Sequence, residues 1–323
     1  MLADLASVDL AARNTPLQRV DALGRSLGLP DGQLWLKRDD LTGVAAGGNK
    51  ARKLEYLVAD ALASGADTLV TTGAAQSNHV RATAAVARQF DLRCVAVLST
   101  LGKQHTAEGN LILDDLFDLE VVWCGPKDRE VTMARVCGEL VDENRRPYPI
   151  PLGGTSPLGA AGYIAAAQEI EAALPGAIVA CAVGTGGTHA GLSVGLGSYD
   201  RVWGFDVAAV PGLKDRLPEI TEQTARLTGF PSPQGRWWVD HSQATAPYGQ
   251  PTPAAHDAIR LVARTTGLVL DPVYTGRAMA GLMSRLADGP SPSAPIVFVH
   301  TGGMPALFTE RYAPWFRVPQ SYD

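Results

Sequence analysis

Two lysines at the start of an expected helix are the residues whose types and spacing most directly suggest chemistry. The stretch AAGGNKARKLEYL, residues 45–57, places Lys50 and Lys53 directly behind two glycines and an asparagine. On a helix both lysines share a face with Leu54 and Leu57, which is expected to be buried. Desolvation and the positive end of the helix both oppose an ammonium group there. The lysines therefore need an anion or have lowered pKa values, unless their stems carry the amines out to water.

A lysine with a lowered pKa is the amine that attacks a carbonyl group to form a Schiff base. The helical spacing turns Arg52 and Glu55 away from the lysine face. We therefore expect Arg52 to be only a surface or inter-domain charge.

The loop GTGGTHAGL, residues 184–192, is a candidate cradle for one phosphate group. Its glycines allow the backbone to present N–H groups, its threonines add hydroxyls, and the following helix adds its positive end. The spacing fits neither the ATP-type P-loop nor the dinucleotide pattern, which would need glycine in place of His189. A structural turn of small residues is the alternative. The residues expected to bind phosphate are Thr185, Gly186, Gly187 and Thr188.

Strand-like and helix-like segments alternate along the 323 residues, which is typical of βαβ units with parallel sheets. Two Pro-rich stretches, 147–157 and 289–295, are interpreted as connections. The expected strands are 67–73, 92–98, 177–183, 267–270 and 294–300, and the expected helices are 80–90, 188–196, 276–286 and 304–308.

Five small or polar loops each open an expected helix. In open α/β sheets, ligands bind near such loops at the carboxyl ends of the strands. Five of them together predict one shared crevice. The loops are 47–50, 71–79, 184–191, 271–276 and 300–303.

Composition excludes several classes of protein. The net charge is −5, and no other run rich in lysine or arginine suggests binding to nucleic acid or a membrane. We expect no transmembrane helix, no signal peptide and a cytoplasmic location. The four cysteines lie far apart without a CxxC pair, so we expect no metal site and no disulfide.

A lysine suited to a Schiff base beside a cup for one phosphate suggests pyridoxal phosphate. The chain resembles fold-type-II pyridoxal-phosphate enzymes, in the group that contains D-cysteine desulfhydrase and 1-aminocyclopropane-1-carboxylate (ACC) deaminase. The resemblance runs in one order from about residue 15 to residue 308. It is carried by LWLKRDDLTGVAAGGNKARKLEYL (34–57), GADTLVTTGAAQSNHVRATAAVA (65–87), GGTSPLGAAGY (153–163), GTGGTHAGL, APYGQPT (246–252), DPVYTGRAMAGL (271–282) and HTGGMPALF (300–308).

The resemblance implies how the cofactor, pyridoxal 5′-phosphate, would be held. Lys50 would carry it as a Schiff base and move the α-proton of the substrate. Lys53 would bind the phosphate together with residues 185–188. Asn78, in QSN, would hydrogen-bond the O3′ oxygen of the ring, and Tyr274, in DPVY, would stack on the ring.

The resemblance also implies a substrate site. Ser77, Asn78 and His79, at a helix N-terminus, would receive the substrate carboxylate, as an anion site there also predicts. Tyr248, in APYG, would approach the substrate.

Two positions favour the desulfhydrase reaction. ACC deaminases carry Glu after the Tyr of DPVY and Leu after the His of the last Gly loop. This chain has Thr275 and Thr301 there, as D-cysteine desulfhydrases do. A neutral hydroxyl leaves the ring nitrogen largely unprotonated, which suits expulsion of a good leaving group better than a long-lived carbanion. Two packing threonines with no effect on catalysis are the alternative.

The expected reaction is α,β-elimination from D-cysteine to pyruvate, sulfide and ammonia. The alternatives are another β-substituted alanine (L-cysteine, cysteate or a thioether) and ACC deamination. The loop 99–110 is shorter than the family leads us to expect, which bears on the stereochemistry and the leaving group.

The resemblance predicts an α/β fold of two three-layer αβα domains with mostly parallel sheets, as in the β subunit of tryptophan synthase. Residues 1–47 and 156–323 would form the cofactor domain, and residues 48–155 a smaller inserted domain. A homodimer is the family expectation.

Overall fold

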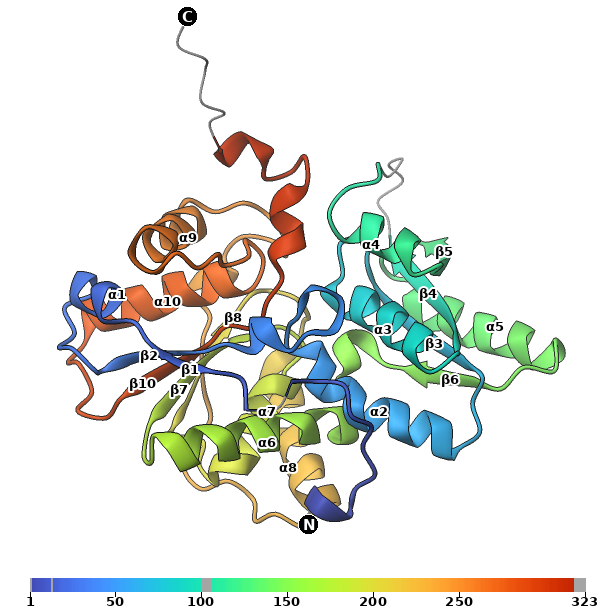
Figure 1. The fold of residues 1–323 in the computed structure, drawn as a ribbon, viewed down its shortest axis with the longest axis horizontal. Helices are drawn as coiled ribbons and strands as arrows, with labels where there is room; N and C mark the ends of the chain where they lie inside the picture. Colours follow the sequence, from blue (N-terminus) through green and yellow to red (C-terminus); the bar gives the residue numbers. More distant parts are fainter. Residues whose placement is uncertain (1, 13, 100–105, 317–323) are drawn as a thin grey trace, which may run out of the picture.

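The structure, a computed structural model, describes residues 2–12, 14–99 and 106–316, whose strands form two separate sheets (Figure 1). The larger sheet has the order β1-β2-β10-β7-β8-β9 and the smaller β5-β4-β3-β6. Neighbouring strands are parallel except β1 and β2. The strands are β1 (Leu17–Arg19), β2 (Leu34–Lys37), β3 (Thr68–Ala74), β4 (Arg93–Ser99), β5 (Glu120–Cys124), β6 (Pro147–Ile150), β7 (Ile178–Val183), β8 (Val202–Asp206), β9 (Trp238–Asp240) and β10 (Ile296–Val299).

Helices cover both faces of each sheet. Helices α1, α9 and α10 lie on one face of the large sheet, and α6, α7 and α8 on the other (Figure 1). In the small sheet, α5 covers one face, and α2 and α3 the other. The expected αβα layers and mostly parallel sheets are confirmed. The helices are α1 (Asp21–Ser26), α2 (Lys50–Ala63), α3 (Asn78–Gln89), α4 (Asn110–Leu116), α5 (Arg129–Asp142), α6 (Pro157–Ala173), α7 (Gly187–Leu196), α8 (Leu213–Thr228), α9 (Pro253–Thr266) and α10 (Thr275–Asp288).

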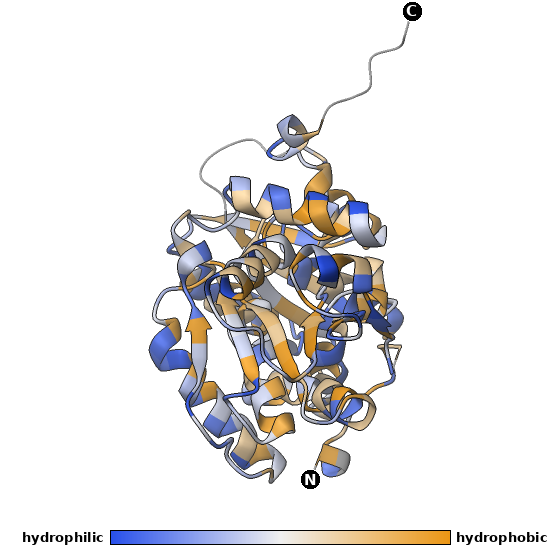
Figure 2. Ribbon diagram, turned by 90° about the vertical axis from the view of Figure 1, so that its left-hand side faces the viewer, coloured by the Kyte–Doolittle hydropathy of each residue, from blue (hydrophilic) through white to orange (hydrophobic). Residues whose placement is uncertain are grey.

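Strand β7 shows why its sequence is apolar on both sides. Val179, Cys181 and Val183 pack toward α6, α7 and α8. Ala180 and Ala182, which alternate with them, pack toward α9 and α10. A parallel sheet covered on both faces requires such continuous apolar strands. Figure 2 shows these apolar strands in the interior, between helices with hydrophilic residues on their outer sides.

Two expected segments differ in the structure. Residues 267–270 form no strand, although Leu270 is fully buried. The Val269 carbonyl accepts a hydrogen bond from the His300 ring, 3.1 Å away, in place of a strand partner. The Pro-rich stretch 147–157 is not only a connection, because it contains β6 at an edge of the small sheet, where proline is tolerated.

The single buried stripe expected for α2 is wrong. Arg52, Glu55 and Ala59 are 2%, 5% and 8% exposed, so the face predicted to lie outside is buried as well. The helix packs against α3 of the small sheet and also against α6 of the large one. A helix between two layers is buried on more than one side, which a one-face helical pattern does not predict.

The division of the chain at residues 47/48 and 155/156 stays a prediction. The strands of the small sheet lie between Thr68 and Ile150, and those of the large sheet come from both sides of this segment. Residues 100–105 of the loop noted above lie outside the described residues. No helix in the described residues is long and apolar enough to cross a bilayer. The same residues contain no cluster of three or more side chains of the types that ligate metals.

Candidate active site

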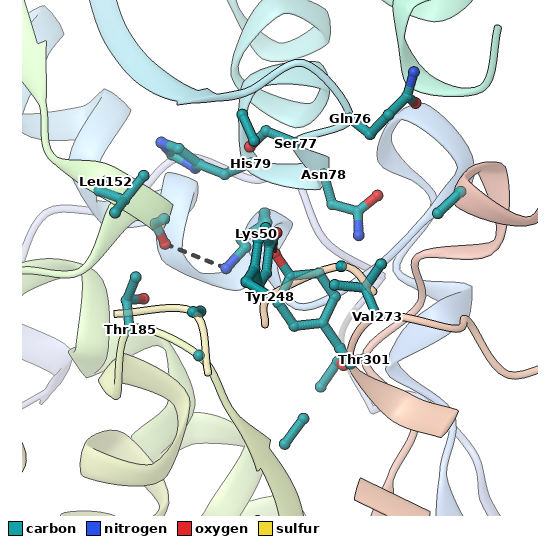
Figure 3. A pocket seen from close by; sticks show the side chains of 18 of the residues that line it. Lys50, Gln76, Ser77, Asn78, His79, Leu152, Thr185, Tyr248, Val273 and Thr301 are labelled. Atoms are coloured by element: carbon teal, nitrogen blue, oxygen red, sulfur yellow. Dashed lines mark hydrogen bonds between the residues drawn. The ribbon is translucent and has the colours of Figure 1, made fainter. Parts of the chain in front are cut away.

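A cavity of about 550 Å³ lies between the two sheets, at the carboxyl ends of their strands (Figure 3). All five predicted loops contribute to its wall, so the prediction of one shared crevice is confirmed. The wall includes Asn49 and Lys50, residues 74–79, residues 184–188, Val273 and Tyr274, and Thr301 and Gly302.

The two lysines of α2 meet at one carbonyl group. The Nζ atoms of Lys50 and Lys53 each donate to the Gly153 carbonyl over 3.3 Å, and Lys53 also donates to Thr155 Oγ1 over 3.1 Å. Burial, together with the nearby charge of Arg81, lowers the pKa of Lys50 to about 8. Burial and the charge of Lys50 lower the pKa of Lys53 well below its ordinary value.

Neither lysine has a carboxylate within ion-pair distance in the described part of the chain. Two buried amines side by side without a counter-ion create a site that favours an anion. Burial therefore lowers the pKa of both Lys50 and Lys53 as predicted, and the binding of an anion between them stays a prediction.

The glycine loop before α7 faces Lys53. Gly186 has a φ of 94°, which favours glycine, and it is the N-cap of α7. A Cβ added to Gly187 would lie 2.7 Å from the Lys53 Nζ atom. Thr185 Oγ1 lies 2.5 Å from Thr155 Oγ1, and Thr188 Oγ1 accepts a bond from the Asn49 amide. A helix N-terminus, bare glycine backbone and a buried ammonium group together fit a phosphate.

The start of α3 forms a second place for an anion. Ser77 is the N-cap, and its Oγ atom accepts a hydrogen bond from the Val80 N–H over 3.3 Å. The N–H groups of Asn78 and His79, in the first turn, have no acceptor within the helix. The His79 ring bonds Thr71 Oγ1 over 2.9 Å, and burial lowers its pKa well below the ordinary value. Figure 3 shows this ring turned away from Lys50.

Two tyrosines share a hydrogen bond in the wall of the cavity. The hydroxyl groups of Tyr248 and Tyr274 contact one another, and their rings meet edge to face. Tyr274 lies against Gly184, where an added Cβ would be 3.4 Å from its ring. Burial raises the pKa of both hydroxyls, so both keep their protons at neutral pH.

The two threonines that separate this chain from ACC deaminases lie in different environments. Thr301 lines the cavity. Thr275 is fully buried behind the wall, and its hydroxyl donates to Asp271 Oδ1 and accepts from the Asp271 N–H, both over 2.7 Å. The structure therefore does not bring Thr275 to the cavity, because its hydroxyl is used to hold the start of α10.

Arg52 is a buried anchor, so of the two roles expected from the sequence the surface charge is wrong, whereas its partners do lie in the segments expected to form the other domain. Its guanidinium group makes two bonds of 2.9 Å to Asp39 and bonds of 2.9 and 2.8 Å to Glu169. Glu169, on α6, also pairs with Lys37. Asp39 also accepts the Tyr163 hydroxyl over 2.7 Å. These contacts tie α2, at the turn that separates Lys50 from Lys53, to the large sheet and to α6.

Sequence reasoning missed several residues that line the cavity. Gln76 is the first residue of the QSN motif and Gly153 is the first residue of GGTSPLGAAGY, but neither was given a role. The other residues lie in segments without a motif, and no sequence signal separates them from ordinary surface residues. They are Glu108, Arg129, Leu152, Arg311 and Tyr312.

A family model described as pyridoxal-phosphate dependent enzyme matches residues 8–302. The chain is 41% identical to a D-cysteine desulfhydrase of Yersinia pestis (strain Pestoides F), over 95% of this chain and 96% of that protein. It is 40% identical to a D-cysteine desulfhydrase of Salmonella typhi, over 93% and 95% of the two chains.

Solved structures agree with these matches. The crystal structure of an ACC deaminase homologue has a TM-score of 0.86 and 36% identity, over 95% of this chain and 94% of that one. The processed form of threonine deaminase isoform 2 from Solanum lycopersicum, 16% identical with a TM-score of 0.65 over 94% of this chain and 83% of that one, shares the fold. The lysine pair, the glycine cradle and these matches together lead to one conclusion: the chain belongs to the pyridoxal-phosphate-dependent enzymes, and its cofactor is pyridoxal 5′-phosphate.

Proposed function

We propose that this protein converts D-cysteine and water to pyruvate, hydrogen sulfide and ammonia. The relatives named D-cysteine desulfhydrase, at 40–42% identity over nearly the whole chain, support this substrate. The structural observation that carries the proposal is the position of Lys50. Its amine has a lowered pKa and lies in a cavity that contains both the glycine cradle and the start of α3.

The residues present fit the cofactor. Lys53 and residues 185–188 would hold its phosphate, because a buried ammonium and bare backbone N–H groups converge there. Lys50 would hold the aldehyde carbon, Asn78 the ring oxygen, and Tyr274 one face of the ring. When bound, pyridoxal phosphate supplies an electron sink that stabilises negative charge at the substrate α-carbon.

The start of α3 would orient the substrate. Its carboxylate would accept bonds from the N–H groups of Asn78 and His79 and from the Ser77 hydroxyl, where the helix contributes partial positive charge. We propose this role for the His79 backbone and not for its ring, which bonds Thr71.

Two groups would move protons. Lys50, as an uncharged amine, would accept the α-proton, which its lowered pKa favours near neutral pH. The Tyr248–Tyr274 hydroxyl pair would donate a proton to the departing sulfur, since both groups are protonated at neutral pH. The Cβ–S bond breaks as the electrons of the Cα–H bond form the Cα=Cβ bond, and hydrolysis of the resulting 2-aminoacrylate gives pyruvate and ammonia.

The test is a product analysis with three substrates. Purified, cofactor-loaded protein is incubated with D-cysteine, L-cysteine and ACC separately, and sulfide, pyruvate and 2-oxobutyrate are quantified. We expect sulfide and pyruvate from D-cysteine. Lys50→Ala should abolish turnover, whereas Lys214→Ala, on the exposed side of α8, should not change it. Turnover of ACC alone, with 2-oxobutyrate as product, would refute the proposed substrate and the argument from the two threonines.

One observation favours a second candidate substrate. This would be a β-substituted alanine, such as cysteate, whose leaving group is an anion. Arg129, at the start of α5, lines the cavity and has no ion pair among the residues described. Its charge reaches Tyr248, whose pKa it lowers against the larger effect of burial. If cysteate is the substrate, the protein releases sulfite and pyruvate from it, and Arg129→Ala raises KM for cysteate more than for D-cysteine.

We also propose that the protein is a cytoplasmic homodimer with a small amino acid as its substrate. The four free cysteines support the location, because a reducing compartment keeps thiols unpaired, and the family resemblance supports the dimer. Light scattering coupled to gel filtration measures the mass in solution, and a monomeric mass would contradict the dimer.

A further inference from the structure

Two buried residues that do not line the cavity hold the side chain of Asn78. Arg81 lies one turn further along α3 and is 1% exposed, and Asn110, the first residue of α4, is fully buried. Arg81 Nη1 donates to Asn78 Oδ1 over 2.8 Å, and Asn110 Nδ2 donates to the same oxygen over 3.0 Å. The Asn78 amide oxygen therefore accepts two hydrogen bonds from outside the cavity.

Chemistry alone decides the orientation of this amide. A guanidinium group has only donors, so the Asn78 atom that faces Arg81 must be the oxygen. The nitrogen, Nδ2, must then face the opposite way. A Cβ added to Gly303, in the loop that follows β10, would lie 3.0 Å from this nitrogen, and Figure 3 shows the nitrogen turned toward Val273 in the cavity wall.

Asn110 is oriented by the same reasoning. Its Oδ1 atom accepts from Arg81 Nη1 over 2.6 Å, and its Nδ2 atom also donates to the Gln76 carbonyl over 2.9 Å. The Gln76 side chain also belongs to this hydrogen-bond network, since its Oε1 atom accepts from the Asn110 N–H over 2.7 Å. Arg81 Nη2 donates to the Gly47 carbonyl over 3.0 Å, next to the loop that carries Lys50. Each amide in this network has one allowed orientation.

We propose that Arg81 and Asn110 are positioning residues that permit only the Nδ2 donor of Asn78 to face the cofactor ring. A donor at this point stabilises a ring oxygen that carries negative charge, whereas a flipped amide would present a carbonyl oxygen and repel it. The proposal rests on the proposed function only in placing Asn78 beside the ring. It makes α4 part of the apparatus that sets the electronic state of the cofactor.

The test reads the visible absorption of the holoenzyme without substrate. Asn110→Ala removes one donor to Asn78 Oδ1 and also the Asn110 oxygen that accepts a bond from Arg81. Arg81→Lys replaces the planar guanidinium group with a single ammonium group. We expect both variants to change the visible absorption band and to lower the affinity for added cofactor about tenfold, the usual effect of one lost hydrogen bond. Arg88→Lys is the matched control, because Arg88 lies on the same helix but bonds exposed carbonyls of Phe117 and Asp118.

A double-mutant cycle separates positioning from general packing. If Arg81 and Asn110 act through Asn78, Asn110→Ala has no further effect on the spectrum or on cofactor affinity in an Asn78→Ala background. Equal effects in both backgrounds would overturn the proposal, and so would a wild-type spectrum in Asn110→Ala. Should Arg81→Lys fail to fold, the Asn110 and Asn78 variants complete the cycle. Because no substrate is added, the result does not depend on whether D-cysteine is the substrate.

Discussion

Replacing Arg52 by methionine should destabilise the protein strongly. Methionine keeps an unbranched apolar side chain but removes every contact of the guanidinium group. Arg52 is 2% exposed and bonds both carboxylate oxygens of Asp39 and both of Glu169. Asp39 is fully buried, and the substitution leaves it only the hydroxyl groups of Thr15 and Tyr163 as partners.

The expected loss follows from the buried carboxylate that remains. Removing one partner of a buried ion pair costs about 3–5 kcal/mol, most of it from the uncompensated charge left behind. Glu169 softens the loss, because it keeps Lys37 and is partly exposed. A cost near 3 kcal/mol would lower the melting temperature by roughly 4–5 °C in a chain of this size.

The same chain provides a control, an arginine whose ion pairs lie on the surface. Arg93 pairs with Glu120 and Glu143 on the surface of the small sheet, where all three side chains are partly exposed. Arg93→Met should cost less than about 1 kcal/mol, as exposed ion pairs do. Urea unfolding of the apo-proteins measures both. If Arg52→Met loses no more stability than Arg93→Met, Arg52 does not anchor α2 and our account of that helix is wrong.

Three further predictions concern the cavity and its supports. In the apo-protein, stability should rise between pH 8 and 10.5, because burial lowers the Lys50 pKa from 10.5 to about 8 and the unfolded chain binds more protons there. Lys50→Met should reduce this rise in urea unfolding, and an unchanged slope would contradict the lowered pKa. Gly187→Ala should weaken cofactor uptake, measured by absorbance titration, because the new methyl group lies 2.7 Å from the Lys53 amine. Gly138→Ala, on α5 with no atom near its Cβ, should take up cofactor as the wild type does. Thr275→Val should lower thermal stability by about 1–3 kcal/mol, because it leaves a buried carboxylate and N–H without their hydroxyl partner; a wild-type melting curve would contradict this.

Sequence reasoning reached the local features of the site. Lys50 and Lys53 were predicted to need an anion because helix geometry puts both on a buried face, and the structure places both amines at the Gly153 carbonyl. The glycine loop before α7 was predicted as a cradle because its composition leaves backbone N–H groups bare. Both inferences needed only the spacing of neighbours along one helix or loop.

It failed where the partner comes from a distant segment. Arg52 was expected to be a surface or inter-domain charge with no named partner, because nothing near it in the chain shows that Asp39 and Glu169 meet it. Thr275 is a different case: its partner Asp271 is only four residues away, but the sequence does not show that the Thr275 hydroxyl bonds this carboxylate and does not face the cavity. Residues 267–270 have the composition of a strand, but a strand also needs a neighbouring edge, and here the His300 ring takes the Val269 carbonyl.

The sequence by itself determined the alternation of strands and helices with parallel sheets, the five loops and the lysine at the start of α2, because periodicity, glycine placement and helix ends are local properties. Only the tertiary structure decided which of these residues share a wall, which face of α2 is buried, and which way the amide of Asn78 points. Those properties depend on contacts between segments far apart in the chain, such as Asn78 with Asn110 and Arg52 with Glu169, and they exist only once the two sheets and their helices have packed together.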